Sequence, residues 1–388
     1  MTARFLPGNR LTLLNSGVEY FPALIKAIDE AQHEVHLETY IFEDDDTGRA
    51  VAEAMANAAR RGVTVRVMVD GFGAQKFAER LQPGLVAAGV QAMVYRPEVA
   101  RLLLRRHRLR RLHRKLSHID GKIAFVGGIN VIDDTNTPHQ IPPRYDYAVR
   151  IEGPLLHPIQ QALQRLWEMV LWVTLNRRYR LTGPLPAAPI AQGEQTAAFL
   201  VRDNIRHRRD IEDAYLQAIA EAEEDVLLAN AYFLPGRRFR RALREARKRG
   251  VRVTILLQGR IEYRLLHYAT QALYGKMLRD GIRIFEYRNS FLHAKVAVID
   301  RQWATVGSSN IDPFSLLLAR EANVVVRDIH FAAELRASLY RAMHTGAREL
   351  PPDSWKRLPW HSRLLRWGSY NLVRVLVGIA GYGGKGQP

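Results

Sequence analysis

Hydrophobic residues change their spacing several times near the start of the chain. Between residues 18 and 29 they recur every three or four positions, which predicts a helix with one apolar face. Residues 35–42 and 63–69 are short apolar runs typical of strands, and residues 48–61 between them have helical spacing that Gly62 is expected to end. A strand, a helix and a strand of these lengths predict a right-handed parallel crossover, and therefore an α/β sheet.

The same order of segments returns later in the chain. Residues 218–226 resemble residues 27–35, and residues 247–251 resemble residues 59–63. The offset is about 190 residues in both cases and drifts slowly, as loop insertions produce after a duplication. We therefore predict two similar halves related by a pseudo-twofold axis, with the active site at their junction.

Two further segments lie between these repeats. Residues 159–175 have an amphipathic pattern, and their charged and polar side chains argue against a membrane span. Residues 183–193 are rich in proline and alanine, which is typical of a linker. We expect this linker to separate the two halves.

One short motif occurs once in each half with identical spacing. A His and a Lys two positions apart are followed by four residues, an Asp, six residues, a Gly, a small residue, any residue and an Asn. The two copies consist of His113, Lys115, Asp120, Gly127, Gly128 and Asn130, and of His293, Lys295, Asp300, Gly307, Ser308 and Asn310. Chance would not easily produce this agreement twice.

The residue types in this motif suit an anion. Apolar residues alternate with other residues from position 292 to 298, which predicts a strand with His293 and Lys295 on one face. If the halves fold against each other, two imidazoles and two ammonium groups surround one pocket. A phosphodiester needs such a set: a nucleophile, an acid for the leaving oxygen, and cations for the oxygens that gain charge in the transition state. This chemistry requires no metal, and we predict no cofactor.

The doubled motif resembles the HxKxxxxD signature of the phospholipase D superfamily. From about residue 13 to about residue 327 the chain is similar to the bacterial cardiolipin synthases, in particular to the shorter type without N-terminal membrane spans. The resemblance implies an α/β fold of two duplicated α/β/α sandwich halves about a pseudo-twofold. We expect these halves at residues 1–182 and 194–350, with the linker between them and a basic, aromatic tail at residues 351–388.

The resemblance also implies the roles of individual residues. The catalytic set is His113, Lys115, Asp120, His293, Lys295 and Asp300. The substrate phosphate is expected to bind Lys115, Lys295, Asn130 and Asn310, and no metal site is expected. By the same resemblance His113 is the nucleophile and His293 the acid and base.

One acidic residue follows each motif in the next expected strand. By the duplication, Asp146 corresponds to Glu321, and each is suited to orient a catalytic imidazole by accepting its second ring proton. The family has an acidic residue at the position of Glu321. It often has Asn two residues earlier, where this chain has Ala319, so the local match is weaker there.

Composition narrows the partners further. The 388 residues contain no cysteine, which excludes disulfides and thiolate chemistry and is typical of a reducing compartment. No secretory signal is visible in the first ten residues, so we expect the protein to stay inside the cell. A formal net charge of +18 favours polyanions, either nucleic acid or anionic lipid headgroups, and charge alone does not choose between them.

Three segments of the chain are strongly basic, and two of them have two interpretations. Residues 101–115 interleave arginines with leucines, as either a solvated basic face or a surface that rests on anionic lipid. Residues 237–249 more simply form a solvated helix face. Residues after 355 combine basic and aromatic residues around the apolar run 372–379, which predicts either an interfacial membrane anchor or a helix packed on the core.

Three functions from different classes fit these patterns. The first is a phosphatidyltransferase that makes cardiolipin from two phosphatidylglycerols, or from phosphatidylglycerol and another phospholipid, through a phosphohistidine intermediate. The second is a hydrolase of phospholipid or DNA, and the third is a non-enzymatic basic binder, which two intact motifs disfavour. A surface that binds single-stranded nucleic acid typically has aromatic residues among its basic ones, for stacking on bases, whereas the basic run 101–115 contains leucines. We therefore expect anionic phospholipids (phosphatidylglycerol, cardiolipin) and a membrane surface as partners and no nucleic acid. The expected location is the cytoplasmic side of the bacterial inner membrane, while the acceptor and the oligomeric state stay open.

Overall fold

The computed structural model describes residues 3–97, 110–137, 140–175, 179, 190–204, 206–353 and 359–379. Within these ranges, strands from both halves of the chain join in one fifteen-stranded sheet. Its order is β17-β12-β11-β10-β14-β15-β16-β9-β1-β8-β6-β5-β2-β3-β4, so the two halves contribute matching series that meet at β9 and β1. Most of residues 101–115 and of the expected linker 183–193 lie outside the described residues.

The strands of the first half are β1 (Leu6–Asn15), β2 (Glu34–Thr39), β3 (Thr64–Asp70), β4 (Gln91–Tyr95), β5 (Lys115–Ile119), β6 (Ile123–Gly127) and β8 (Tyr147–Glu152). Those of the second half are β9 (Gln195–Arg202), β10 (Asp225–Asn230), β11 (Arg252–Gln258), β12 (Arg283–Tyr287), β14 (Lys295–Ile299), β15 (Trp303–Gly307), β16 (Glu321–Arg327) and β17 (Ala347–Glu349). Strands β2, β3 and β4 are parallel, as are β10, β11 and β12. The predicted α/β crossover and its repetition are therefore confirmed.

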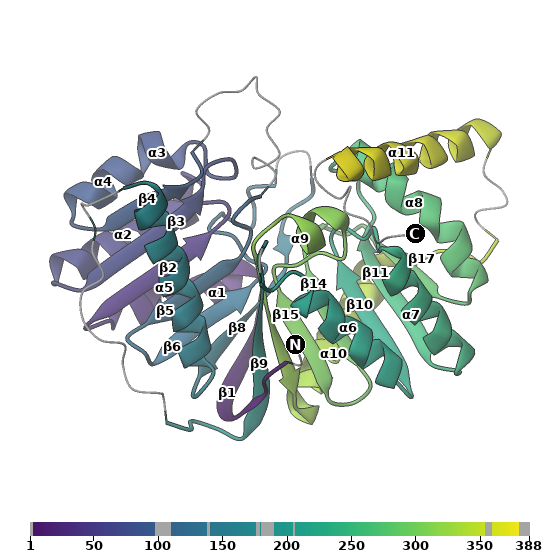
Figure 1. Cartoon of the computed structure of the whole chain (residues 1–388), viewed down its shortest axis with the longest axis horizontal. Coiled ribbons are helices and arrows are strands. Elements are labelled where there is room, and N and C mark those ends of the chain that lie inside the picture. Colours follow the sequence, from purple (N-terminus) through teal and green to yellow (C-terminus); the bar gives the residue numbers. More distant parts are fainter. Residues whose placement is uncertain are drawn as a thin grey trace.

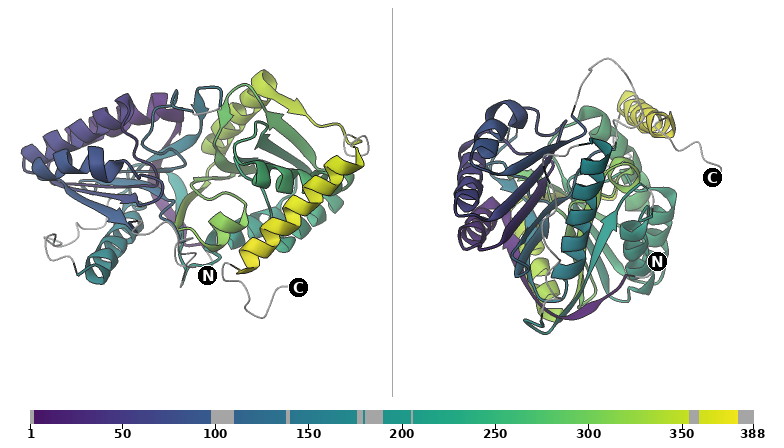
Figure 2. Two further views of the ribbon diagram at one scale, coloured as in Figure 1. Left: turned by 90° about the horizontal axis from the view of Figure 1, so that it is seen from above. Right: turned by 60° about the vertical axis from the view of Figure 1, so that its left-hand side comes forward.

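Helices cover both faces of this sheet (Figure 1, Figure 2). In the first half they are α1 (Ser16–Asp29), α2 (Asp46–Arg60), α3 (Phe77–Arg80), α4 (Gln82–Ala87) and α5 (Leu156–Val173). In the second half they are α6 (Asp210–Glu221), α7 (Arg237–Lys248), α8 (Arg264–Arg279), α9 (Pro313–Leu317), α10 (Ile329–Gly346) and α11 (Trp360–Ile379). The buried apolar residues of α1 and α2 pack on one face of the first half and those of α5 on the other. The helix predicted at residues 159–175 is therefore confirmed as α5.

Local signals explain where α2 begins and ends. The side chain of Asp45 accepts a hydrogen bond from the backbone N–H of Gly48, 2.9 Å away, and so caps the first turn. Beyond Arg61 the chain turns at Gly62 with a φ of +92°, a conformation that a side chain would strain. Gly250 ends α7 in the same way with a φ of +94°.

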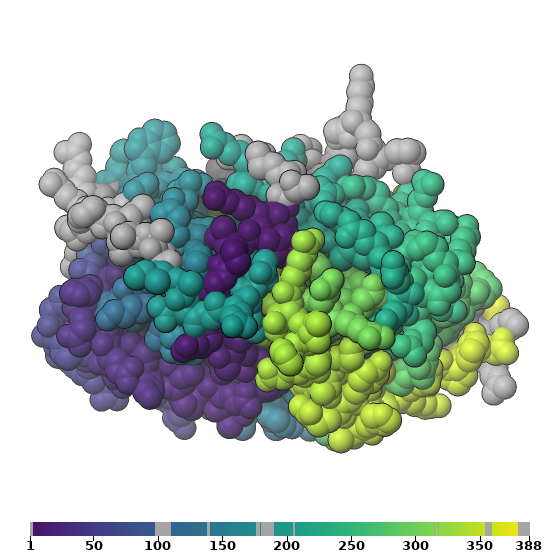
Figure 3. Space-filling model, turned by 90° about the horizontal axis from the view of Figure 1, so that it is seen from below, coloured from purple at the N-terminus to yellow at the C-terminus, as the bar shows by residue number. Residues whose placement is uncertain are grey.

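One apolar core runs across the junction of the halves. It includes Leu13 and Val149 from the first half and Val324, Val326 and Leu335 from the second, each at most 3% exposed. Seen from below, the two halves lie against each other with α10 beside the first half (Figure 3). Because the core is shared, the position of one half fixes the position of the other.

The expected strand at residues 292–298 is interrupted at the motif itself. Residues Phe291–Leu292 form β13, which pairs in parallel with β7 (Arg144–Tyr145) of the first half, and β14 begins only at Lys295. The prediction that His293 lies within one continuous strand is therefore wrong. The reason is physical, since the backbone N–H of His293 donates to the carbonyl oxygen of Tyr145, 2.8 Å away, in the other half.

Candidate active site

The two motif histidines are held by backbone bonds between the halves. The N–H of His293 donates to Tyr145, as described above, and the N–H of His113 donates to the carbonyl oxygen of Arg320 at 3.0 Å. Each histidine thus lies two positions before a strand of its own half, while its backbone is bonded to the other half. This crossing places both copies of the motif at one junction.

Each imidazole pairs with an acid of the opposite half. The Nδ1 atom of His113 lies 3.0 and 3.1 Å from the two carboxylate oxygens of Glu321, and Nδ1 of His293 lies 2.6 Å from Oδ2 of Asp146. When Nδ1–H donates to a carboxylate, Nε2 keeps the lone pair and is available to attack or to accept a proton. The structure therefore gives both acids the orienting position expected for them. The structure also shows that each acid comes from the half opposite its histidine, which the sequence did not predict.

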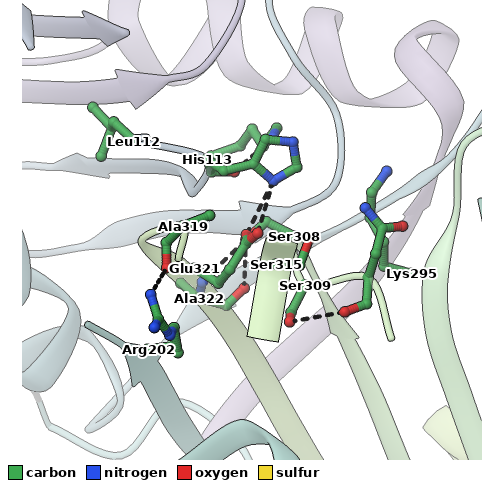
Figure 4. A network of polar contacts seen from close by, with 12 residues as sticks. Leu112, His113, Arg202, Lys295, Ser308, Ser309, Ser315, Ala319, Glu321 and Ala322 are labelled. Atoms are coloured by element: carbon green, nitrogen blue, oxygen red, sulfur yellow. Dashed lines mark hydrogen bonds and ion pairs between the residues drawn. The ribbon is translucent and has the colours of Figure 1, made fainter. Parts of the chain in front are cut away.

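The two acids have different surroundings. The hydroxyl of Ser308 donates to Glu321 Oε2 at 2.5 Å and accepts from the N–H of Ala322 at 3.0 Å (Figure 4). In the other half Gly128 occupies the position of Ser308, and a Cβ there would come within 2.3 Å of Asp146 Oδ1. The glycine is therefore required beside Asp146, while the serine supplies a donor to Glu321.

Both motif lysines are buried in this centre, with 3% exposure for Lys115 and none for Lys295. The ammonium of Lys295 lies 3.3 Å from Asp146 Oδ2, and that of Lys115 donates to the carbonyl oxygen of His113 at 2.5 Å. Burial lowers the pKa of Lys115 to about 7; Glu321 partly opposes this shift and the charge of Lys295 adds to it. Two buried ammonium groups that disfavour each other form a site suited to an anion.

The histidines are also shifted by burial. It lowers the pKa of His113, although Glu321 opposes the shift, and it lowers the pKa of His293 further with the help of Lys295. Burial alone would raise the pKa of Asp146, but the charges of Lys295 and His293 outweigh it and the pKa is lowered. A neutral imidazole beside an ionised carboxylate is the state that a nucleophile or general base needs.

The motif asparagines have one end of their amides fixed. Oδ1 of Asn130 accepts the N–H of Ile41 at 3.1 Å, and Oδ1 of Asn310 accepts the N–H of Tyr232 at 3.4 Å. Both side chains are buried, at 1% and 3% exposure. With the oxygen held by the backbone, each NH₂ group is directed elsewhere as a donor, which suits the expected contact with phosphate oxygens.

The motif aspartates do not belong to this centre, and their expected catalytic role is corrected here. Asp120 accepts the backbone N–H groups of Gln32, His33 and Glu34 at 2.7–2.8 Å, and Asp300 makes the matching bonds to residues 223–225. Both lie beyond the far ends of β5 and β14, and seven residues of extended chain span roughly 20 Å. Their role is to fasten the loop before β2 and before β10.

A pair of crossed His–acid dyads around two buried lysines, at the junction of two duplicated α/β halves, defines the phospholipase D class of phosphodiester chemistry. The family described as "Cardiolipin synthase, PLD-like domain" matches residues 24–167 and 215–343. The chain belongs to this family. The assignment made from the doubled motif and the duplicated α/β fold are both confirmed.

Individual relatives agree with the family. The chain is 36% identical over 392 residues to cardiolipin synthase B of Escherichia coli K12, covering 98% of this chain and 92% of the relative. It is 30% identical over 353 residues to the probable cardiolipin synthase YwiE of Bacillus subtilis, covering 90% and 69%. Among solved structures, a phosphatidylserine synthase of Haemophilus influenzae has a TM-score of 0.70 at 13% identity, covering 96% of both chains. That likeness concerns the fold alone.

Proposed function

We propose that this protein is a cardiolipin synthase, a phosphatidyltransferase that moves the phosphatidyl group of one phospholipid, phosphatidylglycerol, to an alcohol of another. The observation that carries the proposal is the pair of crossed dyads, His113–Glu321 and His293–Asp146, around Lys115 and Lys295. The similarity to cardiolipin synthases over nearly the whole chain supports the transfer reaction.

The proposed reaction has two displacements at phosphorus. His293 enters this step as an imidazolium, a charge that ionised Asp146 and the bound phosphate anion favour. Nε2 of His113 attacks the donor phosphorus, the bond from phosphorus to the glycerol oxygen breaks, and His293 gives its Nε2 proton to that oxygen. The hydroxyl of the acceptor then loses its proton to His293 and attacks phosphorus, which breaks the bond to His113. His113 returns to its neutral state, and the products are cardiolipin and glycerol.

The remaining motif residues bind the phosphate in this proposal. The ammonium groups of Lys115 and Lys295 and the amide NH₂ groups of Asn130 and Asn310 contact the non-bridging oxygens. Their donors are fixed before the reaction, so they stabilise the charge that develops in the transition state without reorganising. These contacts hold the phosphate in place while His113 attacks and His293 transfers the proton.

The second candidate is a hydrolase in which water replaces the acceptor alcohol. The dyads would serve this reaction equally well, since transfer and hydrolysis differ in how the pocket excludes water. Family and relatives favour transfer. Phospholipid is the favoured substrate over DNA for the same reason.

We also propose that the protein works at the surface of a membrane, on the cytoplasmic side of the bacterial inner membrane. In the described part of the chain, none of the helices has the length and apolar content to cross a bilayer. Helix α11 packs against α8 through Val373, which is 1% exposed. Its other sides expose the apolar side chains of Trp360, Leu364, Leu365, Trp367, Leu372, Val375 and Leu376. A helix of this kind, without acidic residues, suits the interface of an anionic bilayer.

The decisive experiment uses purified protein and vesicles that contain labelled phosphatidylglycerol. We expect cardiolipin and glycerol to form, as separated by chromatography and mass spectrometry. Phosphatidic acid as the main product would replace transfer by hydrolysis. No conversion of the lipid would contradict both candidates.

A further inference from the structure

The hydrogen bonds around the site allow the two halves to be compared position by position. The N–H of Leu112 donates to Asp70 Oδ2 at 2.8 Å, and the N–H of Leu292 makes the matching bond to Gln258 Oε1 at 3.2 Å. Asp70 and Gln258 are each followed by a glycine whose N–H bonds to the end of the next parallel strand. The bonds of Asn130 and Asn310 to the backbone, described above, align the ends of β2 and β10 in the same way.

With this alignment, three positions beside the site have a polar side chain only on the side of His293. Tyr232 corresponds to Ile41, and Glu262 corresponds to Ala74. Arg144 corresponds to Ala319. The matched groups are a phenol against an alkyl chain, a carboxylate against a methyl group, and a guanidinium against a methyl group. The pocket around the two dyads is therefore unequal, and at these three positions the polar side chains lie on the side of His293. The order is reversed at Tyr40, whose ring centroid lies 4.9 Å from that of His113 and which corresponds to Ala231.

The polar side chains form one cluster next to His293. The hydroxyl of Tyr232 donates to Oε2 of Glu262, and the backbone N–H of Tyr232 binds the motif residue Asn310. The guanidinium carbon of Arg144 lies 4.9 Å from the centroid of the Phe291 ring, which is itself 5.8 Å from the centroid of His293. The cluster therefore borders the imidazole that is paired with Asp146.

Electrostatics agree with this placement. Burial is the largest cause that lowers the pKa of His293, and the positive charges of Lys295 and Arg144 lower it further. Burial also lowers the pKa of Arg144, while the charges of Glu262 and Asp146 oppose that shift. The carboxylate of the cluster and the carboxylate of the dyad therefore both act on Arg144.

Groups in this cluster have hydrogen-bonding capacity left over. Arg144 is 6% exposed, and its Nε is buried without a hydrogen-bond partner in the described structure. Glu262 lies in the exposed loop between β11 and α8, where a ligand can reach its carboxylate. A buried donor without a partner beside an accessible acceptor suits a molecule with several hydroxyl groups.

We propose that Tyr232, Glu262 and Arg144 form the subsite for the polyol headgroup, the glycerol part that leaves the donor and the glycerol part of the incoming acceptor. This inference rests on the proposed function and adds the place where the alcohol is recognised. Glu262 accepts hydrogen bonds from the hydroxyls that do not react, and Tyr232 orients that carboxylate. Arg144 donates hydrogen bonds to the same headgroup.

The subsite also explains the division of roles between the histidines. In a displacement at phosphorus, the attacking and leaving groups lie on opposite sides of the phosphorus atom. A leaving glycerol held beside Tyr232 and Glu262 has its oxygen next to His293, which therefore gives that oxygen its proton. The attacking imidazole is then His113, which agrees with the role that the resemblance to the family implies for it.

The test is a competition between two alcohols that differ only in their extra hydroxyls. Labelled phosphatidylglycerol is the donor, and deuterated glycerol and 1-propanol are supplied together at equal concentration. The ratio of deuterated phosphatidylglycerol to phosphatidylpropanol, measured by mass spectrometry, reports preference within a single reaction. A site that bonds substrate hydroxyls strongly rejects an analogue without them, so we expect the unaltered protein to prefer glycerol by roughly tenfold or more.

Glu262→Gln and Tyr232→Phe should each reduce this ratio by roughly tenfold, because they weaken contacts that only glycerol makes. The matched control is Glu43→Gln, which changes a carboxylate on the opposite half that is 3.4 Å from Lys76 and should keep the ratio. Thermal melting confirms that the variants are folded. An unchanged ratio in both Glu262→Gln and Tyr232→Phe would overturn the subsite. Absence of transfer to any alcohol by the unaltered protein would instead refute the proposed function.

Discussion

Glu321 stands 208 positions after His113 in the chain, yet its carboxylate lies 3.0 Å from Nδ1 of that imidazole. In the reciprocal pair, His293 and Asp146 are 147 positions apart in the chain, and Nδ1 of His293 lies 2.6 Å from Oδ2 of Asp146. Each dyad thus takes its histidine from one half and its acid from the other. Neither half holds a complete dyad, and catalysis depends on how the halves are packed.

The first prediction separates the roles of the histidines. In His293→Ala, His113 should still attack, but the proton transfer that releases the intermediate is lost, so a phosphatidyl adduct accumulates. In His113→Ala no adduct should form. Intact-protein mass spectrometry after incubation with phosphatidylglycerol measures both. An adduct in His113→Ala but not in His293→Ala would exchange the roles.

The second prediction concerns the crossed acids. Asp146→Asn and Glu321→Gln should each lower turnover by roughly 10²- to 10⁴-fold, because an amide no longer fixes the required imidazole tautomer. Ser308→Ala, which removes one donor to Glu321, should cost less, roughly tenfold. In ¹⁵N-resolved spectra of the histidine rings, Glu321→Gln should alter His113 first. A change confined to His293 would show that the pairing does not cross between the halves.

The third prediction is the effect of pH through Lys115, whose pKa in the free protein is about 7. The ammonium form binds the phosphate, so kcat/KM should fall as the pH rises above about 7. A bound phosphodiester favours the charged form and raises this pKa, so the alkaline limit of kcat should lie at higher pH than that of kcat/KM. Steady-state kinetics between pH 5 and 10 provide both profiles. If the alkaline limits of kcat and kcat/KM fall at the same pH, Lys115 does not contact the phosphate.

A fourth prediction follows from the correction for Asp120. Asp120→Ala removes the acceptor of three backbone N–H groups at a partly exposed loop, and it should reduce the free energy of unfolding by about 1–3 kcal/mol. Turnover of the folded fraction should stay within a few-fold of the original. Urea unfolding and kinetics on the same samples measure the two effects, with the exposed Glu53→Ala as control. A loss of turnover of roughly 10²-fold or more, without a change in stability, would restore a catalytic role.

The fifth prediction distinguishes the two sides of α11. Trp367→Ser and Leu364→Ser change exposed side chains and should weaken sedimentation with anionic vesicles, with little change in Tm. Val373→Ser changes a buried contact with the core and should lower Tm by several degrees. Binding should also decrease with salt, because basic residues contribute to it. If the exposed variants bind vesicles like the original protein, α11 is part of the core and not an anchor.

The sequence predicted the fold well because its main signal is local. Short apolar runs on both sides of an amphipathic segment identified β2, α2 and β3, and Gly62 marked the end of the helix. The duplication then transferred the same prediction to the second half. The residues of the His–Lys motif were found in the same way, since identical spacing in two copies needs no knowledge of the fold.

The sequence could not predict the crossing of the dyads. Asp146 and Glu321 occupy the same position in each repeat, so spacing along the chain assigns each of them equally well to either histidine. The pairing of β7 with β13 decides it, and that contact joins segments that are far apart in the chain. The structural role of Asp120 could have been predicted from the sequence. The five residues of β5 lie between His113 and Asp120, so the two side chains are at opposite ends of that strand.

Strands β9 and β1 meet as antiparallel neighbours at the centre of the sheet, with equivalent series of strands on both sides. Such an interface is self-complementary: a shorter chain carrying one motif would form the same contact with a second copy of itself, as an isologous homodimer does. In such a homodimer both dyads would be identical. Joining the copies in one chain removes this constraint, so that Asp146 can face Gly128 in one dyad while Glu321 faces Ser308 in the other, and each can specialise for its own step.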